Sequence, residues 1–235
     1  MVEANAMPVS NRLLSGLPRA ERRRFLDLCE TVELSFGSVL CEADQPFRQV
    51  YFPLTSFISL VASVSGHQPL EMAMIGSEGV LGASLVLGVA DAPLRAVVQG
   101  PGSALRIGVA QFQRARRDSP ALMRGLNRYL YVLMTQLSQT TACTRFHEVD
   151  TRLARWLLMT HDRAHADHFH LTHQFLADML GVRRSGITVA AGELQRRGLI
   201  HYARGEIQIL DRGGLESASC ECYEAIVEDY ARLLP

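Results

Sequence analysis

Arginine is the residue whose type and spacing offer the clearest chemistry in this sequence. All 24 basic residues are arginines, so every fixed positive charge is a planar guanidinium that can donate paired hydrogen bonds to a phosphate or to guanine. The lack of lysine also fits a GC-rich genome. The formal net charge is zero. From Arg183 to Arg204, however, five arginines stand against the single acid Glu193, which predicts a local basic patch for an anionic partner.

Two short helices joined by a glycine turn are predicted to position these arginines. Thr172 is a suitable N-cap for the first helix, and Gly181 suits the left-handed position that ends it. The second helix stops at Gly198. Its buried face is predicted to consist of Ile187, Ala190, Ala191 and Leu194, which follow one another at the helical spacing i, i+3, i+4 and i+7. A strand pair follows, turned at Ala203-Arg204-Gly205. The pattern is that of a helix-turn-helix with a wing.

The charge at the start of the second helix decides between two interpretations. Arg183 and Arg184 lie at the positive end of the helix dipole, which is unfavourable within the protein itself. The same arrangement attracts a phosphate, because free backbone N–H groups and arginines point at one anion. A helical hairpin with a solvated charged edge is the alternative. We predict that the helix, with Ser185 and Thr188 on its outer face, reads DNA.

In the rest of the chain the pattern of apolar residues changes twice, from helical to strand-like and back to helical. A short helix is expected from Leu13 to Cys29, and short strand-like runs separated by Gly, Pro, Asp and Ser fill Thr31 to Ile107, which predicts a β-sandwich or roll of roughly eight strands. Helices are expected after Pro120 to about Arg145, from Asp150 to about His161, and from Leu215 to Leu234.

The helix after Pro120 carries a leucine stripe, formed by Leu126, Leu130, Leu133 and Leu137. Such a stripe can pack on the β-domain, or it can pair with its twin in a coiled-coil dimer. We favour the dimer.

No metal site or catalytic site is predicted. The five cysteines are scattered, which suits reduced thiols, and Cys220 and Cys222 stand too close together and too isolated for a zinc site. The histidines from His161 to His173 show no ligand spacing with a carboxylate or thiol, so we interpret that segment as a solvated interdomain linker. There is no nucleophile elbow, phosphate loop, HExxH or paired-carboxylate motif. We predict that the protein is not an enzyme.

Length and composition describe a folded protein of one large or two modest domains, with 235 residues, 48% hydrophobic and 20% charged. The apolar run from Val80 to Ala90 is too short for a bilayer, and the N-terminal residues lack a secretory signal pattern. We expect a cytoplasmic protein that is not bound to a membrane.

With these motifs in order along the chain, the sequence resembles the Crp/Fnr family of bacterial transcription regulators. The resemblance runs from Leu13 to about Asp211 and is most specific in RLARWLL, LTHQFLADMLGVRRSGIT and LIHYARGEIQIL. It implies an α+β fold with three parts: a cyclic-nucleotide-binding-like β-roll sensor domain (1–117), a long dimerisation helix (118–147), and a C-terminal winged helix-turn-helix domain with a terminal helix (148–235).

The resemblance implies a set of DNA-binding residues. Arg184 matches the arginine that contacts bases in the family, whereas Ser185 and Val189 replace the glutamate and second arginine of its best-known pattern, so we expect a different target sequence. The expected DNA-binding residues are Thr172, His173, Gln174, Arg183, Arg184, Ser185, Thr188 and Arg204.

The sensor side departs further from the family. Members that bind cyclic AMP use a Gly-Glu pair for the ribose and an Arg-Ser pair for the phosphate. Here Gly82 is kept, but Ala83 stands at the position of the glutamate. Leu94 and Arg95 stand at the positions of the arginine and the serine, and a shift of the alignment by one residue would bring Arg95 to the arginine position. Leu137 replaces an adenine-contacting threonine. We therefore expect no classical cyclic-AMP binding. No cofactor is predicted, and an unknown small-molecule effector stays open, with a pocket at Gly82, Ala83, Leu94, Arg95, Leu137 and Ser138.

The leading hypothesis is a homodimeric regulator, paired through residues 120–145, that binds a near-palindromic site in double-stranded DNA with half-sites about one helical turn apart. The resemblance leaves RNA polymerase open as a further partner. The alternative is a ligand- or partner-binding β-roll module whose C-terminal domain mainly makes protein contacts. That alternative predicts weak, unselective DNA binding that does not depend on Arg184.

Overall fold

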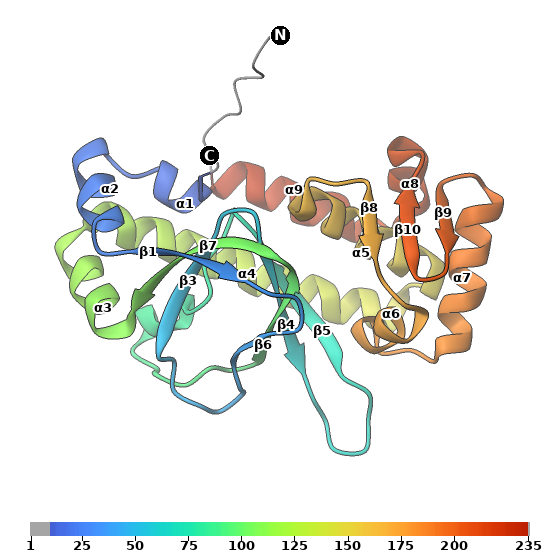
Figure 1. Cartoon of the computed structure of the whole chain (residues 1–235), viewed down its shortest axis with the longest axis horizontal. Helices are drawn as coiled ribbons and strands as arrows, with labels where there is room; N and C mark the ends of the chain where they lie inside the picture. Colours follow the sequence, from blue (N-terminus) through green and yellow to red (C-terminus); the bar gives the residue numbers. More distant parts are fainter. Residues whose placement is uncertain (1–9, 235) are drawn as a thin grey trace, which may run out of the picture. The chain divides into compact units, whose positions relative to one another are not determined.

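The computed structural model describes residues 10–234, which fold into two compact units of mixed helices and strands (Figure 1). Of these residues, one unit comprises those up to Ile58, Ile75–Leu130, and residues 233–234; the other comprises Ser59–Met74 and Tyr131–Arg232. The predicted α+β class is confirmed.

Seven strands form the predicted β-region: β1 (Glu30–Leu34), β2 (Val39–Cys41), β3 (Gln49–Pro53), β4 (Phe57–Ala62), β5 (Leu70–Ile75), β6 (Arg95–Gly100) and β7 (Gly102–Gly108). They make two sheets, in the orders β1-β7-β3 and β2-β6-β4-β5. β1 and β3 pair antiparallel with β7, and β2 pairs antiparallel with β6. A 3₁₀ helix, η1 (Ala83–Leu87), lies between β5 and β6.

The N-terminal helix is two helices rather than the single one predicted. α1 (Arg12–Ser15) is capped by Asn11, and α2 (Arg19–Leu26) begins after Pro18. The break follows from Pro18, which lacks an N–H and therefore cannot continue a helix from the preceding turn. A further helix, α3 (Val109–Asp118), was not predicted. Phe25 of α2 and Phe112 of α3 pack on Phe52 of β3, with ring centroids 5.3 and 6.3 Å apart.

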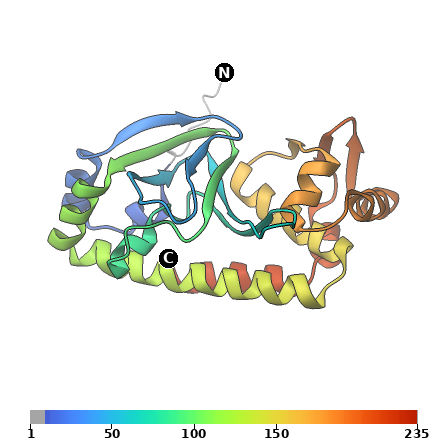
Figure 2. The ribbon, with the colours of Figure 1, turned by 90° about the horizontal axis from the view of Figure 1, so that it is seen from below.

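The predicted long helix is confirmed as α4 (Pro120–Phe146), the extended helix along the lower edge of Figure 2. Of its leucine stripe, Leu126 is buried, whereas Leu130, Leu133 and Leu137 are half-buried. The fully buried face of α4 is a neighbouring row: Leu122, Leu126, Tyr129, Val132, Gln136, Thr140 and Cys143. Tyr131 and Met134 are more than half exposed on α4.

A three-stranded sheet and three helices form the predicted winged helix-turn-helix. The helices are α5 (Val149–Ala164), α6 (His173–Leu180) and α7 (Arg184–Arg196), and the strands β8 (His168–His170), β9 (Ile200–Ala203) and β10 (Glu206–Ile209) pair in the order β8-β10-β9. The linker interpretation of the histidine-rich segment is wrong. Its first part completes α5 and its second part is β8, because Phe169 alternates inward between two exposed histidines.

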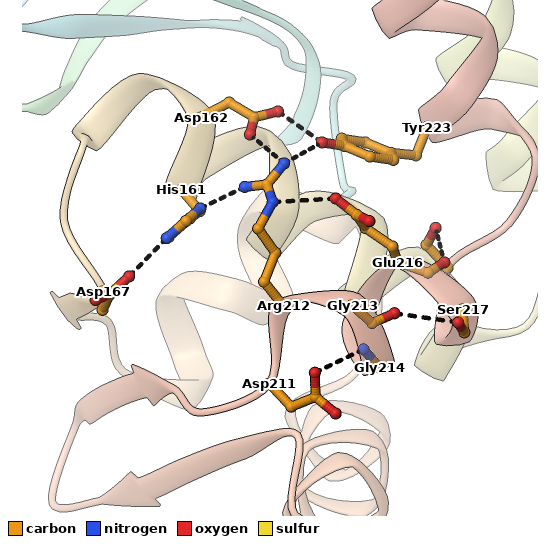
Figure 3. A network of polar contacts seen from close by, with 11 residues as sticks. His161, Asp162, Asp167, Asp211, Arg212, Gly213, Gly214, Glu216, Ser217 and Tyr223 are labelled. Atoms are coloured by element: carbon orange, nitrogen blue, oxygen red, sulfur yellow. Dashed lines mark hydrogen bonds and ion pairs between the residues drawn. The ribbon is translucent and has the colours of Figure 1, made fainter.

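The predicted C-terminal helix is also two helices, α8 (Arg212–Ala218) and α9 (Cys222–Leu233), interrupted at Ser219-Cys220-Glu221. Asp211 caps α8, since its Oδ1 accepts the Gly214 N–H at 2.9 Å. Arg212, the first residue of α8, joins α8 to α5 (Figure 3). Its guanidinium binds Asp162 at 2.8 Å, Glu216 at 3.0 Å and the Tyr223 hydroxyl at 2.7 Å, and it also contacts His161.

Candidate nucleic-acid interface

The turn between α6 and α7 has the predicted geometry at both ends. The Thr172 hydroxyl accepts the Phe175 N–H at 3.1 Å and so caps α6. Gly181 follows α6 with a φ of 63°, the left-handed conformation that a side chain would disfavour. Arg152 on α5 is buried and donates a hydrogen bond to the Leu180 carbonyl, which otherwise lacks a helical partner. α5 therefore holds the end of α6 in place.

One face of α7 is buried and the opposite face is free for a partner. The four predicted core residues, Ile187, Ala190, Ala191 and Leu194, are all at most 4% exposed. Arg183, which is the N-cap, and Arg184, Ser185 and Thr188 on the first turns are exposed. The first turn contains no acidic residue. Two arginines thus stand uncompensated at the positive end of the helix, the arrangement that favours a bound anion.

His173 connects the helix pair to the wing. Its Nδ1 lies 3.0 Å from the Thr188 hydroxyl, and its ring stacks on Tyr202 of β9 with centroids 4.3 Å apart. Desolvation by burial, together with the charge of Arg184, lowers the pKa of His173. Both effects favour the neutral imidazole, and its contacts with Thr188 and Tyr202 join α7 to β9. Gln174 is exposed, and its amide donates to Asp178 at 2.8 Å.

The wing is a two-residue hairpin. Ala203 pairs with Glu206, and the intervening Arg204 and Gly205 have φ values of 52° and 86°. Positive φ at both central residues matches the twist of the two strands and keeps the hairpin short. Arg204 is exposed at the tip. Of the expected DNA-binding residues, all but the half-buried His173 are exposed.

Two residues of this surface were not predicted as part of the site. Gln195 accepts the Tyr202 N–H through its side-chain oxygen at 2.6 Å, and so fastens α7 to the wing. Val189 is 73% exposed in the middle of α7. The sequence could have indicated that Val189 belongs to this surface, because a residue four positions after Ser185 lies on the same outward face of the helix.

Farther along α7, one of the two arginines is held in an ion pair. Glu193 holds Arg196 with two hydrogen bonds, of 2.9 and 2.6 Å. Next to the turn of the wing, His170 lies 2.7 Å from Glu206. Arg197 at the C-cap of α7 is exposed, and no ion pair holds it within residues 10–234. Arginines without an ion pair therefore lie at both ends of α7, Arg183 and Arg184 at its start and Arg197 at its end, and at Arg204 on the wing.

The expected effector-pocket residues lie in separate elements. Gly82, in the left-handed region with a φ of 101°, precedes η1, and Ala83 is buried at its start. Arg95 opens β6 next to Leu94, and its Nε lies 3.2 Å from a Glu42 carboxylate oxygen. Leu137 and Ser138 follow one another on α4. Among residues 10–234, none of the helices combines the length and apolarity needed to cross a bilayer.

Comparison with known proteins places this site in a recognised domain type. Residues 151–218 match the Crp-like helix-turn-helix domain. No curated protein matches the chain. Among solved structures, FixK2 from Bradyrhizobium japonicum is 16% identical, with 82% of this chain and 98% of that chain covered and a TM-score of 0.68.

Two further solved structures agree. The c-di-GMP-responsive global regulator CLP of Xanthomonas campestris is 16% identical over 82% of this chain and 99% of that chain, with a TM-score of 0.67. A CRP/FNR-family transcriptional regulator of Thermus thermophilus is 22% identical over 81% of this chain and 98% of that chain, with a TM-score of 0.67. At these identities the likeness shows a shared fold, that of Crp/Fnr-type regulators.

Proposed function

We propose that this chain, which has the fold of a Crp/Fnr-type transcription regulator and a Crp-like helix-turn-helix domain, binds a specific sequence of double-stranded DNA and regulates transcription in the cytoplasm. The observation that carries the proposal is the start of α7, where Arg183 and Arg184 are exposed and uncompensated. An exposed arginine pair at a helix N-terminus costs stability in the free protein and is favourable only with an anionic partner.

The contacts divide by chemistry. Arg184, Ser185 and Thr188 lie on the exposed first turns of α7, where side chains of a recognition helix meet base edges in the major groove. A guanidinium suits the O6 and N7 acceptors of guanine. Val189 presents an apolar surface to a thymine methyl group. Base contacts of this kind give the sequence preference.

Phosphate contacts then fix the orientation. Arg183 at the N-cap and Arg204 at the wing tip are exposed charges at the two ends of this surface. The capped start of α6, with Thr172, His173 and Gln174, offers backbone N–H groups and polar side chains to the DNA backbone. These contacts are expected to make the affinity fall steeply with salt concentration.

We further propose a homodimer through residues 120–145. The exposed Tyr131 and Met134 lie beside the half-buried Leu130, Leu133 and Leu137 on α4, which leaves an apolar strip beyond the face that the chain itself buries. A twofold dimer would bind a near-palindromic site with half-sites about one helical turn apart. In this arrangement residues 1–117 would serve as sensor, 118–147 as dimerisation helix and 148–235 as DNA-binding domain.

The effector, in this proposal, is a small molecule other than cyclic AMP. Ala83 offers no carboxylate for a ribose, and the Arg95 guanidinium is already paired with Glu42. A cyclic phosphate would therefore have to displace that ion pair. For a protein that activates transcription of its target genes, the proposal includes a contact with RNA polymerase.

The first test is selection of fragments from the encoding genome by the purified protein at near-physiological salt, followed by sequencing. A twofold-symmetric motif is the expected result. Arg184→Ala should weaken binding to that motif by about 10- to 100-fold and relax the preference at one base pair. Arg196→Ala is the matched control on the same helix, because Glu193 already compensates Arg196. Equal losses in both variants, or unselective binding that ignores Arg184, would refute the proposal in favour of a protein-binding C-terminal domain.

A further inference from the structure

Three thiols and an imidazole converge at the C-terminal end of α4. They are Cys143, His147, Cys220 and Cys222, and one ligand atom from each lies within 4.8 Å of the others. The Cys143 and Cys220 sulfurs are 3.6 Å apart, and the Cys222 sulfur lies 3.5 Å from His147 Nδ1. The three cysteines are buried and His147 is half-buried. Within residues 10–234 this is the cluster whose donor atoms could surround one metal ion.

We propose that these four residues bind a Zn²⁺ ion in a tetrahedral Cys₃His site. With Zn–S bonds of about 2.3 Å and Zn–N bonds of about 2.1 Å, a regular tetrahedron has S–S and S–N edges of roughly 3.6–3.8 Å. The two short distances in the cluster match those edges. Four ligands from the protein fill the coordination sphere of zinc, so the site is structural and leaves no position for substrate.

The fold builds the site from two short segments far apart in the chain. Cys143 and His147 are four residues apart at the C-terminal end of α4, so their side chains lie on one face. The interruption between α8 and α9 brings Cys220 and Cys222 to the same place. Had residues 215–234 continued as one helix, side chains two positions apart would have pointed about 200° apart around its axis and could not share an ion.

Neighbouring residues hold this geometry. The Arg212 network fixes the start of α8 on α5 and reaches Tyr223, the residue after Cys222 (Figure 3). On the other side, Gln136 donates to the Tyr230 hydroxyl at 2.9 Å and so joins α4 to α9. Figure 2 shows α9 running along the C-terminal half of α4. Both pairs of ligands are therefore held by contacts that do not involve the metal.

The outer shell also fits zinc. The Nε2 atom of His147 lies 3.2 Å from the Glu221 carboxylate, which leaves Nδ1 free to face Cys222 and the ion. A carboxylate on the second imidazole nitrogen orients a ligating histidine and fixes its tautomer. Three thiolates on Zn²⁺ leave one net negative charge. Arg155, which is buried, interacts electrostatically with Cys143 and so contributes a positive charge near the site.

The test is metal analysis of the full-length protein, made in zinc-supplemented medium and purified under argon without chelator. We expect about one zinc per chain. Cys143→Ser and Cys222→Ser should lose it. Cys29→Ser and Cys41→Ser are matched controls, because both residues lie outside the cluster, and these variants should keep the zinc.

A second measurement keeps the test valid if the cysteine variants fail to fold. The wild-type protein, stripped of metal and titrated with Co²⁺, should show thiolate-to-cobalt charge transfer and tetrahedral d–d bands that Zn²⁺ abolishes. Glu221→Gln keeps all four ligands and should weaken zinc binding by about 10- to 100-fold. The proposal is overturned by protein without metal that binds no Co²⁺, by iron and sulfide in place of zinc, or by a Cys143–Cys220 disulfide in protein purified under argon. Zinc retained by Cys143→Ser would overturn it equally.

Discussion

Glu71 on β5 should make the stability of the protein depend on pH in a direction opposite to that of most acids. Its carboxylate is buried, and it accepts hydrogen bonds from the Ser59 hydroxyl at 2.5 Å and from the Trp156 indole at 2.9 Å. Desolvation by burial raises the pKa of Glu71 from its ordinary 4.5 to about 7, although both hydrogen bonds and the charges of Arg155 and Arg163 oppose the rise.

The linkage between proton binding and folding gives the sign and the size of this effect on the free energy of unfolding. Between pH 4.5 and 7 the folded state keeps the proton on Glu71 while the unfolded state has lost it, so the free energy of unfolding falls as pH rises through this window. Each pKa unit corresponds to 1.36 kcal/mol, which gives about 3 kcal/mol over the window. Glu71→Gln removes the titrating group, while its amide can still accept from Trp156 and donate to Ser59. The variant should match wild type below pH 4.5, exceed it by on the order of 1 kcal/mol at pH 5, and exceed it by about 3 kcal/mol above pH 7.

Urea unfolding at pH 5 to 8 measures this difference, and Trp156, the single tryptophan, reports it by fluorescence. The emission of the native protein should also titrate near pH 7, because the indole donates directly to Glu71. Histidines titrate in the same range, so the quantity of interest is the difference between wild type and Glu71→Gln. Glu224→Gln, on an exposed acid of α9, is the control. Parallel pH profiles for wild type and Glu71→Gln would refute the reasoning.

Two further predictions concern the recognition unit and the dimer. Thr172→Ala removes the side-chain acceptor of the Phe175 N–H and should lower the free energy of unfolding by about 1 kcal/mol, whereas Thr172→Ser should keep it; a loss shared by both variants would assign the effect to the methyl group. Met134→Glu should convert the proposed dimer to a monomer in sedimentation experiments, because it places a charge in the apolar strip of α4. Val64→Glu, at an equally exposed apolar residue (64% for both), should leave the dimer intact; a dimeric Met134→Glu protein would exclude α4 as the interface.

The elements that sequence reasoning predicts best are those specified by neighbours in the chain. The N-cap at Thr172, the left-handed Gly181 and the apolar spacing from Ile187 to Leu194 are local patterns, and all three are confirmed. The wing is likewise confirmed, because its turn lies between two alternating runs. None of these features needs a distant contact to be recognised.

The predictions fail where a distant part of the chain decides the local structure. The alternation of His168, Phe169 and His170 is too short to predict a strand by itself, but these three residues pair with the edge of β10 as β8. Likewise the predicted C-terminal helix breaks at Cys220, next to Cys143, which lies 77 positions earlier in the chain. The only local sign of the cysteine–histidine cluster was the spacing of Cys143 and His147 by one helical turn. Judged alone, the Cys220-x-Cys222 pair could not indicate a metal site.

Buried polar residues explain why the second unit adopts one arrangement among several that its apolar pattern would allow. The apolar side chains of β5 could pack on the helices in more than one register, but the N–H of Met74 donates to the Gln136 side chain at 2.7 Å, which fixes β5 against α4. Glu71 fixes the same strand against α5 through Trp156, and the Trp156 ring packs edge-on against Phe175 of α6, with centroids 6.4 Å apart. Because an unpaired buried polar group is costly, a shift of β5 would have to carry α5 with it or break these bonds. α5 in turn holds the end of α6, directly before α7, so the position of β5 and the orientation of the proposed DNA-binding surface are physically coupled within this unit.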